Sequence, residues 1–110
     1  MRLAWFRATR PDSGDLLDHL GLITQRLQRS HELEIVTEAD AFDFAWKHSR
    51  RPYDLCVYET GRDRAHAFVW PYLLHYPGVA ILHRPDVRDA RVWRGSRAVV
   101  VFDAAVARSL

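Results

Sequence analysis

The stretch Tyr53–His83 reads YDLCVYETGRDRAHAFVWPYLLHYPGVAILH and predicts a complete strand–helix–strand unit. Its first part, Tyr53–Glu59, has an unbroken apolar centre, which is typical of a strand covered on both faces of a sheet. A helix is expected from about Asp63, and Pro71 should either kink that helix or mark a new first turn. The apolar run Gly78–His83 then predicts the next strand.

The flanking sequence repeats this alternation. Apolar runs bounded by turn residues predict further strands at Arg2–Ala8, His31–Thr37 and Arg97–Phe102. Ser13 should cap a first helix, and Asp40 a second one. The apolar face of the first helix is expected to hold Leu16, Leu17, Leu20, Ile23 and Leu27. The second helix is expected to bury Phe42, Ala45 and Trp46, and a last helix should begin at Asp103.

Strands that alternate with helices predict the α/β class, here one Rossmann-like three-layer domain over residues 1–110. The expected sheet is parallel, has about five strands and carries helices on both faces. Ligands bind such sheets beyond the carboxyl ends of the strands. The loops that matter should therefore be 9–15, 60–66 and 83–88.

Composition narrows the class of protein. The chain has 110 residues and a net charge of +2, with neither the basic stripe nor the motif typical of nucleic-acid binding. No apolar run approaches the ~20 residues of a membrane span. The single cysteine, Cys56, cannot form an intramolecular disulfide, and this favours a reducing, cytoplasmic location with Cys56 as a buried apolar residue.

A few polar residues fall where ligands bind. Ser13 and Gly14 precede a helix, where backbone N–H groups attract anions; a plain helix cap is the alternative. His83 ends a strand and is suited either to a ligand hydroxyl or acid–base chemistry, or to a backbone hydrogen bond. His66 has no partner at metal-ligand spacing, so no metal site is expected. A series of arginines predicts a cationic helix face, either simply solvated or making weak peripheral contact with an anionic membrane; it comprises Arg84, Arg88, Arg91, Arg94 and Arg97.

The block Tyr53–His83 resembles the N-terminal domain of family 4 glycosyltransferases, which have two lobes and the GT-B architecture. The resemblance lies in the Tyr-Asp start of the strand, the turn glycine Gly61, and the helix with His66 and Trp-Pro-Tyr-Leu. Tyr-Pro-Gly then leads into a strand that ends in Leu-His. The family's Leu-His-Asp is Leu-His-Arg here, with Arg84 in the place of the aspartate.

The resemblance implies an acceptor-side lobe of an enzyme that moves a sugar from a nucleotide-sugar donor to a glycan or lipid-linked acceptor. It implies neither a metal nor another cofactor, and a C-terminal donor lobe as the partner without which this lobe is inactive. The implied substrate-binding residues are Ser13, Gly14, Gly61, His66 and His83. The alternative is a stand-alone flavodoxin-like or Rossmann-like interaction or regulatory module without catalysis. An exposed apolar patch, and with it a homodimer, is expected in either case.

Overall fold

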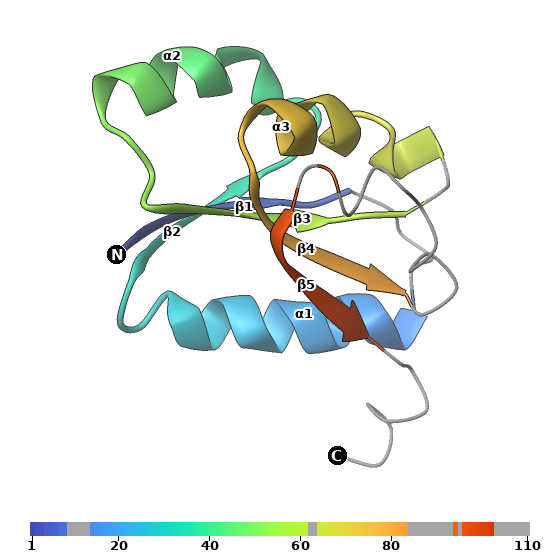
Figure 1. The fold of residues 1–110 in the computed structure, drawn as a ribbon. Coiled ribbons are helices and arrows are strands. Elements are labelled where there is room, and N and C mark those ends of the chain that lie inside the picture. The colour runs from blue at the N-terminus through green and yellow to red at the C-terminus, as the bar shows by residue number, and fades with distance from the viewer. Residues whose placement is uncertain (9–13, 62–63, 84–93, 95, 103–110) are drawn as a thin grey trace.

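The computed structural model describes residues 1–8, 14–61, 64–83, 94 and 96–102, and for 14–19, 82–83 and 101–102 it describes the backbone alone. Five strands and three α-helices alternate along the chain (Figure 1). The strands are β1 Arg2–Phe6, β2 Glu32–Val36, β3 Leu55–Glu59, β4 Gly78–His83 and β5 Ser96–Phe102. The helices are α1 Gly14–Leu27, α2 Phe44–Arg50 and α3 Val69–His75, with short 3-10 turns η1 Ala41–Asp43 and η2 Arg64–His66.

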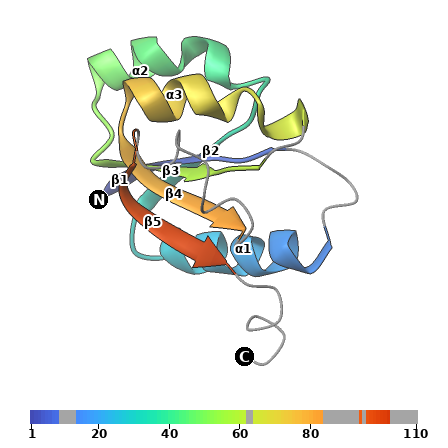
Figure 2. The same ribbon diagram turned by 45° about the vertical axis from the view of Figure 1, so that its right-hand side comes forward.

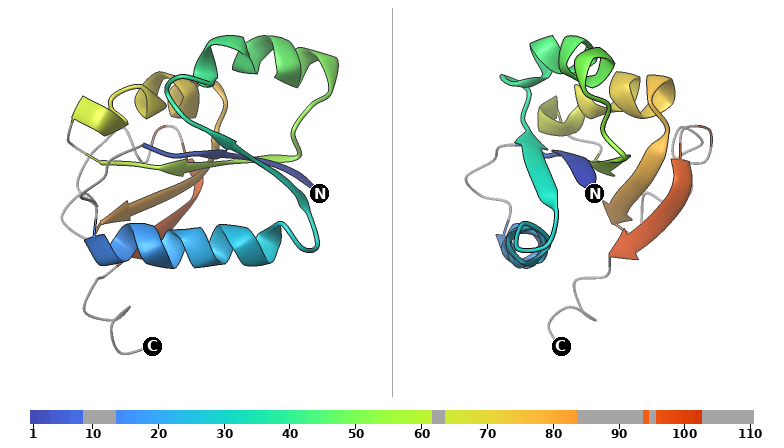
Figure 3. Two further views of the ribbon diagram at one scale, coloured as in Figure 1. Left: turned by 180° about the vertical axis from the view of Figure 1, so that it is seen from behind. Right: turned by 90° about the vertical axis from the view of Figure 1, so that its left-hand side faces the viewer.

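All five strands are parallel and lie in the order β2-β1-β3-β4-β5. The sheet separates α1 from α2 and α3, so helices cover both of its faces (Figure 3). The α/β class, the parallel sheet and the three layers are thus confirmed. The direction of the order reverses between β1 and β3, so the sheet has its topological switch point there.

The face under α2 and α3 is built from aromatic rings. Phe6, the last residue of β1, stacks on Tyr58 of β3 with ring centroids 4.7 Å apart. It also meets the edge of Phe44 at 4.9 Å. Phe44 is fully buried and in turn packs against Tyr53 and Tyr76. We call this the aromatic face.

The opposite face, under α1, is smaller and aliphatic, and we call it the α1 face. Trp5, Val57 and Ile81 project from β1, β3 and β4 to meet Leu20. The expected stripe on α1 was partly wrong, because Ile23 is 43% exposed whereas Thr24 is buried. Thr24 fits the apolar face because its hydroxyl donates to backbone carbonyls of its own helix, at 2.9 Å for Gly21.

The prediction for α2 was wrong about which side faces the core. Phe42 and Trp46 are 85% and 60% exposed, and Ala45 is exposed too. Ala41 and Phe44 are buried instead. The helix is entered through the 3-10 turn η1, whose period of three residues directs positions 41 and 44 to the same side. An α-helical period of about 3.6 residues that starts at Asp40 therefore predicts the wrong buried side for α2.

Other expectations differ only in their bounds. The first strand was expected to reach Ala8 but ends at Phe6, although the Arg7 N–H still donates to the Val36 carbonyl at 3.0 Å. The third helix divides into η2 and α3, with Pro71 in the first turn of α3 (Figure 2). The expected helix at Asp103 lies outside the described residues, as do Arg84, Arg88 and Arg91 of the arginine series. Arg97 belongs to β5 and not to a helix.

Candidate functional site

The carboxyl edge of the sheet gathers the segments that carry the expected site residues. Gly14 begins α1 after β1, Gly61 follows β3, and His83 is the last residue of β4. His66 ends η2, between β3 and α3, and is half-buried. In a parallel sheet these positions share one edge, and Figure 1 shows α1 beginning at the end to which the β4 arrow points. Ser13 lies outside the described residues.

The turn after β3 is held by the helix that follows it. Gly61 is buried, and its backbone carbonyl accepts a hydrogen bond from Trp70 Nε1 at 3.3 Å. Trp70 stands in the first turn of α3 and is itself buried. Two parts of the Tyr53–His83 block, its turn glycine and its Trp-Pro pair, are therefore joined by a direct contact. This contact fixes Gly61 at the carboxyl edge.

Tyrosine hydroxyls fix α3 on the sheet. The Tyr58 hydroxyl, from the centre of the sheet, donates to backbone carbonyls at the end of α3, at 3.2 Å for Tyr72 and also to Tyr76. Burial raises the pKa of Tyr58, so this hydroxyl stays protonated and remains a donor. The Tyr72 hydroxyl reaches across to the Ala41 carbonyl at 2.9 Å and ties α3 to η1. The layer that carries His66 and Gly61 is therefore rigidly anchored.

A buried ion pair lies at the switch point, and sequence reasoning missed it. Glu59 ends β3, and its Oε2 accepts hydrogen bonds from Arg7 Nε at 2.8 Å and from Trp5 Nε1. The carboxylate is buried, and the Arg7 side chain is only 16% exposed. The Arg7 guanidinium also reaches the Thr24 hydroxyl at 3.5 Å. The cluster joins β1, β3 and α1 at the carboxyl ends of β1 and β3.

Thr60 closes the sheet beside this ion pair. Its backbone N–H and its hydroxyl both donate to the Ile81 carbonyl, at 2.9 and 3.1 Å. Both groups are buried, so β3 and β4 remain paired up to the last residue before the Gly61 turn. No motif in the sequence marks Thr60, Arg7 or Glu59. The only signal is their position just after or at the end of buried strands.

The described part of this edge carries several hydrogen-bonding groups. Both donors to Glu59 meet its Oε2, so this carboxylate ties Trp5 and Arg7 of β1 to the end of β3. Among the described residues, no group of three or more histidine, cysteine, aspartate or glutamate side chains could hold a metal ion. The described helices include none that is long and apolar enough to cross a membrane. The described residues at this edge include the backbone of Gly61 and the half-buried His66.

Comparisons with known proteins add no assignment. No family model, no curated protein and no solved structure matches the chain. The function is therefore argued from the sequence block and from the geometry of the carboxyl edge.

Proposed function

We propose that the chain is the acceptor-side domain of a two-lobed glycosyltransferase of the family 4 kind. In this proposal, the carboxyl edge contacts a glycan or lipid-linked acceptor, and a second lobe supplies the nucleotide-sugar donor. The domain alone has no transferase activity. A cytoplasmic location belongs to the same proposal and rests on the single, buried Cys56.

The proposal rests chiefly on the placement of the Tyr53–His83 block. Its turn glycine, Gly61, and two of its three histidines, His66 and His83, belong to segments at the carboxyl edge, where parallel sheets bind ligands. Two aromatic residues of the block support these segments, since Trp70 holds Gly61 and Tyr58 holds α3. A binding surface is expected to rest on a rigid layer of this kind.

The proposal is tested by titrating the ¹⁵N-labelled chain with N-acetylglucosamine, lactose and uridine diphosphate while amide shifts are recorded. We expect saturable shifts at Gly61, His66 and Gly14 with at least one sugar, with a Kd of about 1 mM or weaker. Uridine diphosphate should cause none, because donor binding belongs to the second lobe. His66→Ala should abolish the sugar response, whereas His75→Ala, an exposed histidine at the other end of α3, should leave it unchanged.

The outcomes separate clearly. Nucleotide binding at the carboxyl edge without any sugar response would contradict an acceptor lobe. A sugar response that survives in His66→Ala and His83→Ala would remove both histidines from the proposed site.

A second candidate function has its own support. The strand order 2-1-3-4-5 is the order of flavodoxin-like domains, and Phe42 and Trp46 present aromatic surface to solvent. A stand-alone interaction module, including a homodimer, is therefore the alternative. Sedimentation equilibrium at increasing concentration tests it: a dimer that Trp46→Ala dissociates favours the module. A monomer at all concentrations contradicts the homodimer.

A further inference from the structure

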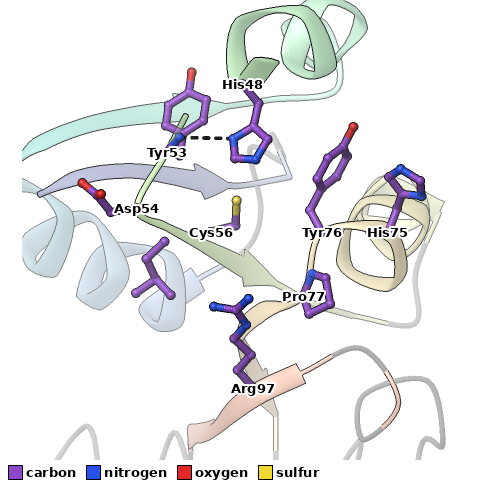
Figure 4. Close-up of a pocket in the computed structure, with 9 residues that line it drawn as sticks. His48, Tyr53, Asp54, Cys56, His75, Tyr76, Pro77 and Arg97 are labelled. Atoms are coloured by element: carbon purple, nitrogen blue, oxygen red, sulfur yellow. Dashed lines mark hydrogen bonds between the residues drawn. The ribbon is translucent and has the colours of Figure 1, made fainter. Parts of the chain in front are cut away.

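A pocket opens at the amino edge of the sheet, away from the candidate acceptor site (Figure 4). Its volume is about 260 Å³, slightly below the ~300 Å³ at which pockets for drug-sized ligands begin. It lies where β3, β4 and β5 begin, between the ends of α2 and α3. The residues used below are His48, Cys56, Tyr76, Pro77 and Arg97.

The floor of the pocket is uncharged and closely packed. Cys56 is 6% exposed, and burial raises the pKa of its thiol, so the sulfur stays protonated. Next to it, β4 starts with Gly78, where a Cβ atom would lie 2.1 Å from the Cys56 carbonyl oxygen. Only glycine permits this approach, and Pro77 before it lines the pocket.

One wall presents a hydrogen-bond donor of known orientation. His48 Nδ1 accepts the backbone N–H of Tyr53 at 3.1 Å. Because Nδ1 accepts this hydrogen bond, the nitrogen of the ring that can donate is Nε2. The ring stacks on Tyr53 and Phe44, and Tyr76 meets it edge-on at 5.4 Å. The imidazole therefore cannot rotate freely, and its Nε2–H remains the polar group available to a ligand.

The pocket lining also contains a cationic side chain, Arg97. Arg97, near the start of β5, extends its guanidinium toward Cys56 and Pro77 (Figure 4). No described carboxylate forms an ion pair with Arg97. The pocket also has one carboxylate, Asp54, but its Oδ2 already accepts the Arg2 backbone N–H at 2.6 Å. A guanidinium fork that is paired with no carboxylate of the described residues, above an uncharged floor, is suited to an anionic ligand.

We propose that this pocket binds a small carboxylate with a planar apolar body, which Arg97 and the His48 Nε2–H hold by its oxygens. Arg97 supplies one positive charge, and the Asp54 carboxylate in the same lining repels a phosphate dianion more strongly than a monoanion, so a single negative charge suits the pocket best. The Tyr76 ring and Pro77 flank the space that the apolar body would fill. The inference is independent of the proposed acceptor site, since the two share no residue and lie at opposite edges of the sheet.

The test titrates the full chain with benzoate and, as an uncharged analogue of the same shape, benzamide. We expect benzoate to cause saturable amide shifts at Cys56 and Arg97, and benzamide to bind at least about tenfold more weakly. Arg97→Gln should weaken benzoate binding about tenfold or more, because it removes a charged donor from an exposed position. The matched control is Arg64→Gln, an exposed arginine at the carboxyl edge, and it should bind benzoate like the wild type.

Three results would overturn the inference. They are the absence of saturable shifts at Cys56 and Arg97, equal affinity for benzoate and benzamide, and equal losses in Arg97→Gln and Arg64→Gln. If acetate or inorganic phosphate binds as tightly as benzoate, the planar body is not recognised and the proposed ligand class is wrong. His48→Gln keeps a donor near the Nε2 position, so it should retain more binding than His48→Ala. If His48→Ala bound benzoate more tightly than His48→Gln, His48 would be excluded as a donor.

Discussion

The two faces of the sheet are joined to their helices by different means. On the aromatic face, the ring of Phe44 packs against the rings of Phe6, Tyr53, Tyr72 and Tyr76. Tyrosine hydroxyls on this face also donate hydrogen bonds to backbone carbonyls. On the α1 face, a small apolar cluster adjoins the buried Glu59 with its donors. Packing specifies the first face, whereas the second combines packing with one charge pair. Substitutions on the two faces should therefore lower the free energy of unfolding for different physical reasons.

The largest effect is expected from Phe44→Ala on the aromatic face. The substitution empties a fully buried position and removes five ring contacts, so the free energy of unfolding should fall by about 4 kcal/mol. Urea denaturation followed by circular dichroism measures this. The control is Phe42→Ala, two residues away and 85% exposed, which should change stability by less than about 0.5 kcal/mol. Similar losses for the two variants would contradict the assignment of the buried side.

That pair of phenylalanines also shows what sequence could and could not predict. Strand positions were predicted to within one or two residues, because apolar runs bounded by turn residues carry their own signal. The buried side of α2 was predicted wrongly, because the 3-10 turn at Ala41–Asp43 shifts the helical phase. The hydrophobic periodicity of the sequence does not reveal that turn.

The candidate site likewise contains residues that the sequence could predict and residues that it could not. Gly61, His66 and His83 could be assigned to one edge, since topology alone brings the carboxyl ends of parallel strands together. The ion pair of Arg7 and Glu59 could not be predicted, because its two residues are 52 positions apart in the sequence. Each of them, taken singly, resembles an ordinary surface charge. The same holds for the pocket, whose lining comes from α2, β3 and β5.

The next largest effect should come from Glu59→Ala on the α1 face. It leaves Arg7 without its carboxylate and Trp5 Nε1 without an acceptor, and the expected loss is about 3 kcal/mol. Glu59→Gln keeps an oxygen for these donors and removes only the charge, so it should cost less than Glu59→Ala. Urea midpoints of the two variants measure the difference. Equal losses would mean that the charge, and not the acceptor, is what matters.

A smaller effect tests whether the aromatic face depends on charge at all. The Tyr53 hydroxyl donates to Glu34, and Lys47 Nζ donates to the same carboxylate at 2.9 Å. Burial alone would raise the pKa of Glu34, but these two donors together hold it below its ordinary value. A lowered folded pKa gives stability that is present at neutral pH and is lost as pH falls through that pKa.

Tyr53→Phe should therefore cost about 1 kcal/mol or less at pH 7, since Glu34 is partly exposed. The difference from the wild type should narrow as the pH falls through the lowered pKa of Glu34, where the carboxylate protonates. Thermal unfolding from pH 7 to pH 3 measures both. Tyr76→Phe is the control, because no carboxylate among the described residues accepts from its hydroxyl, and its difference from the wild type should not change with pH. A gap that widens for Tyr53→Phe in acid would reverse the assigned sign.

The smallest effect is expected from Trp46→Ala, on the outer side of the same helix that buries Phe44. Trp46 is 60% exposed, and its ring contacts the Arg50 guanidinium at 5.1 Å, a solvent-exposed cation–π pair. The free energy of unfolding should fall by about 0.5 kcal/mol or less, since most of the side chain is already in water. A loss above about 2 kcal/mol would mean that Trp46 packs against the fold in solution. A small loss would show that an aromatic residue stabilises this face only where it reaches the sheet.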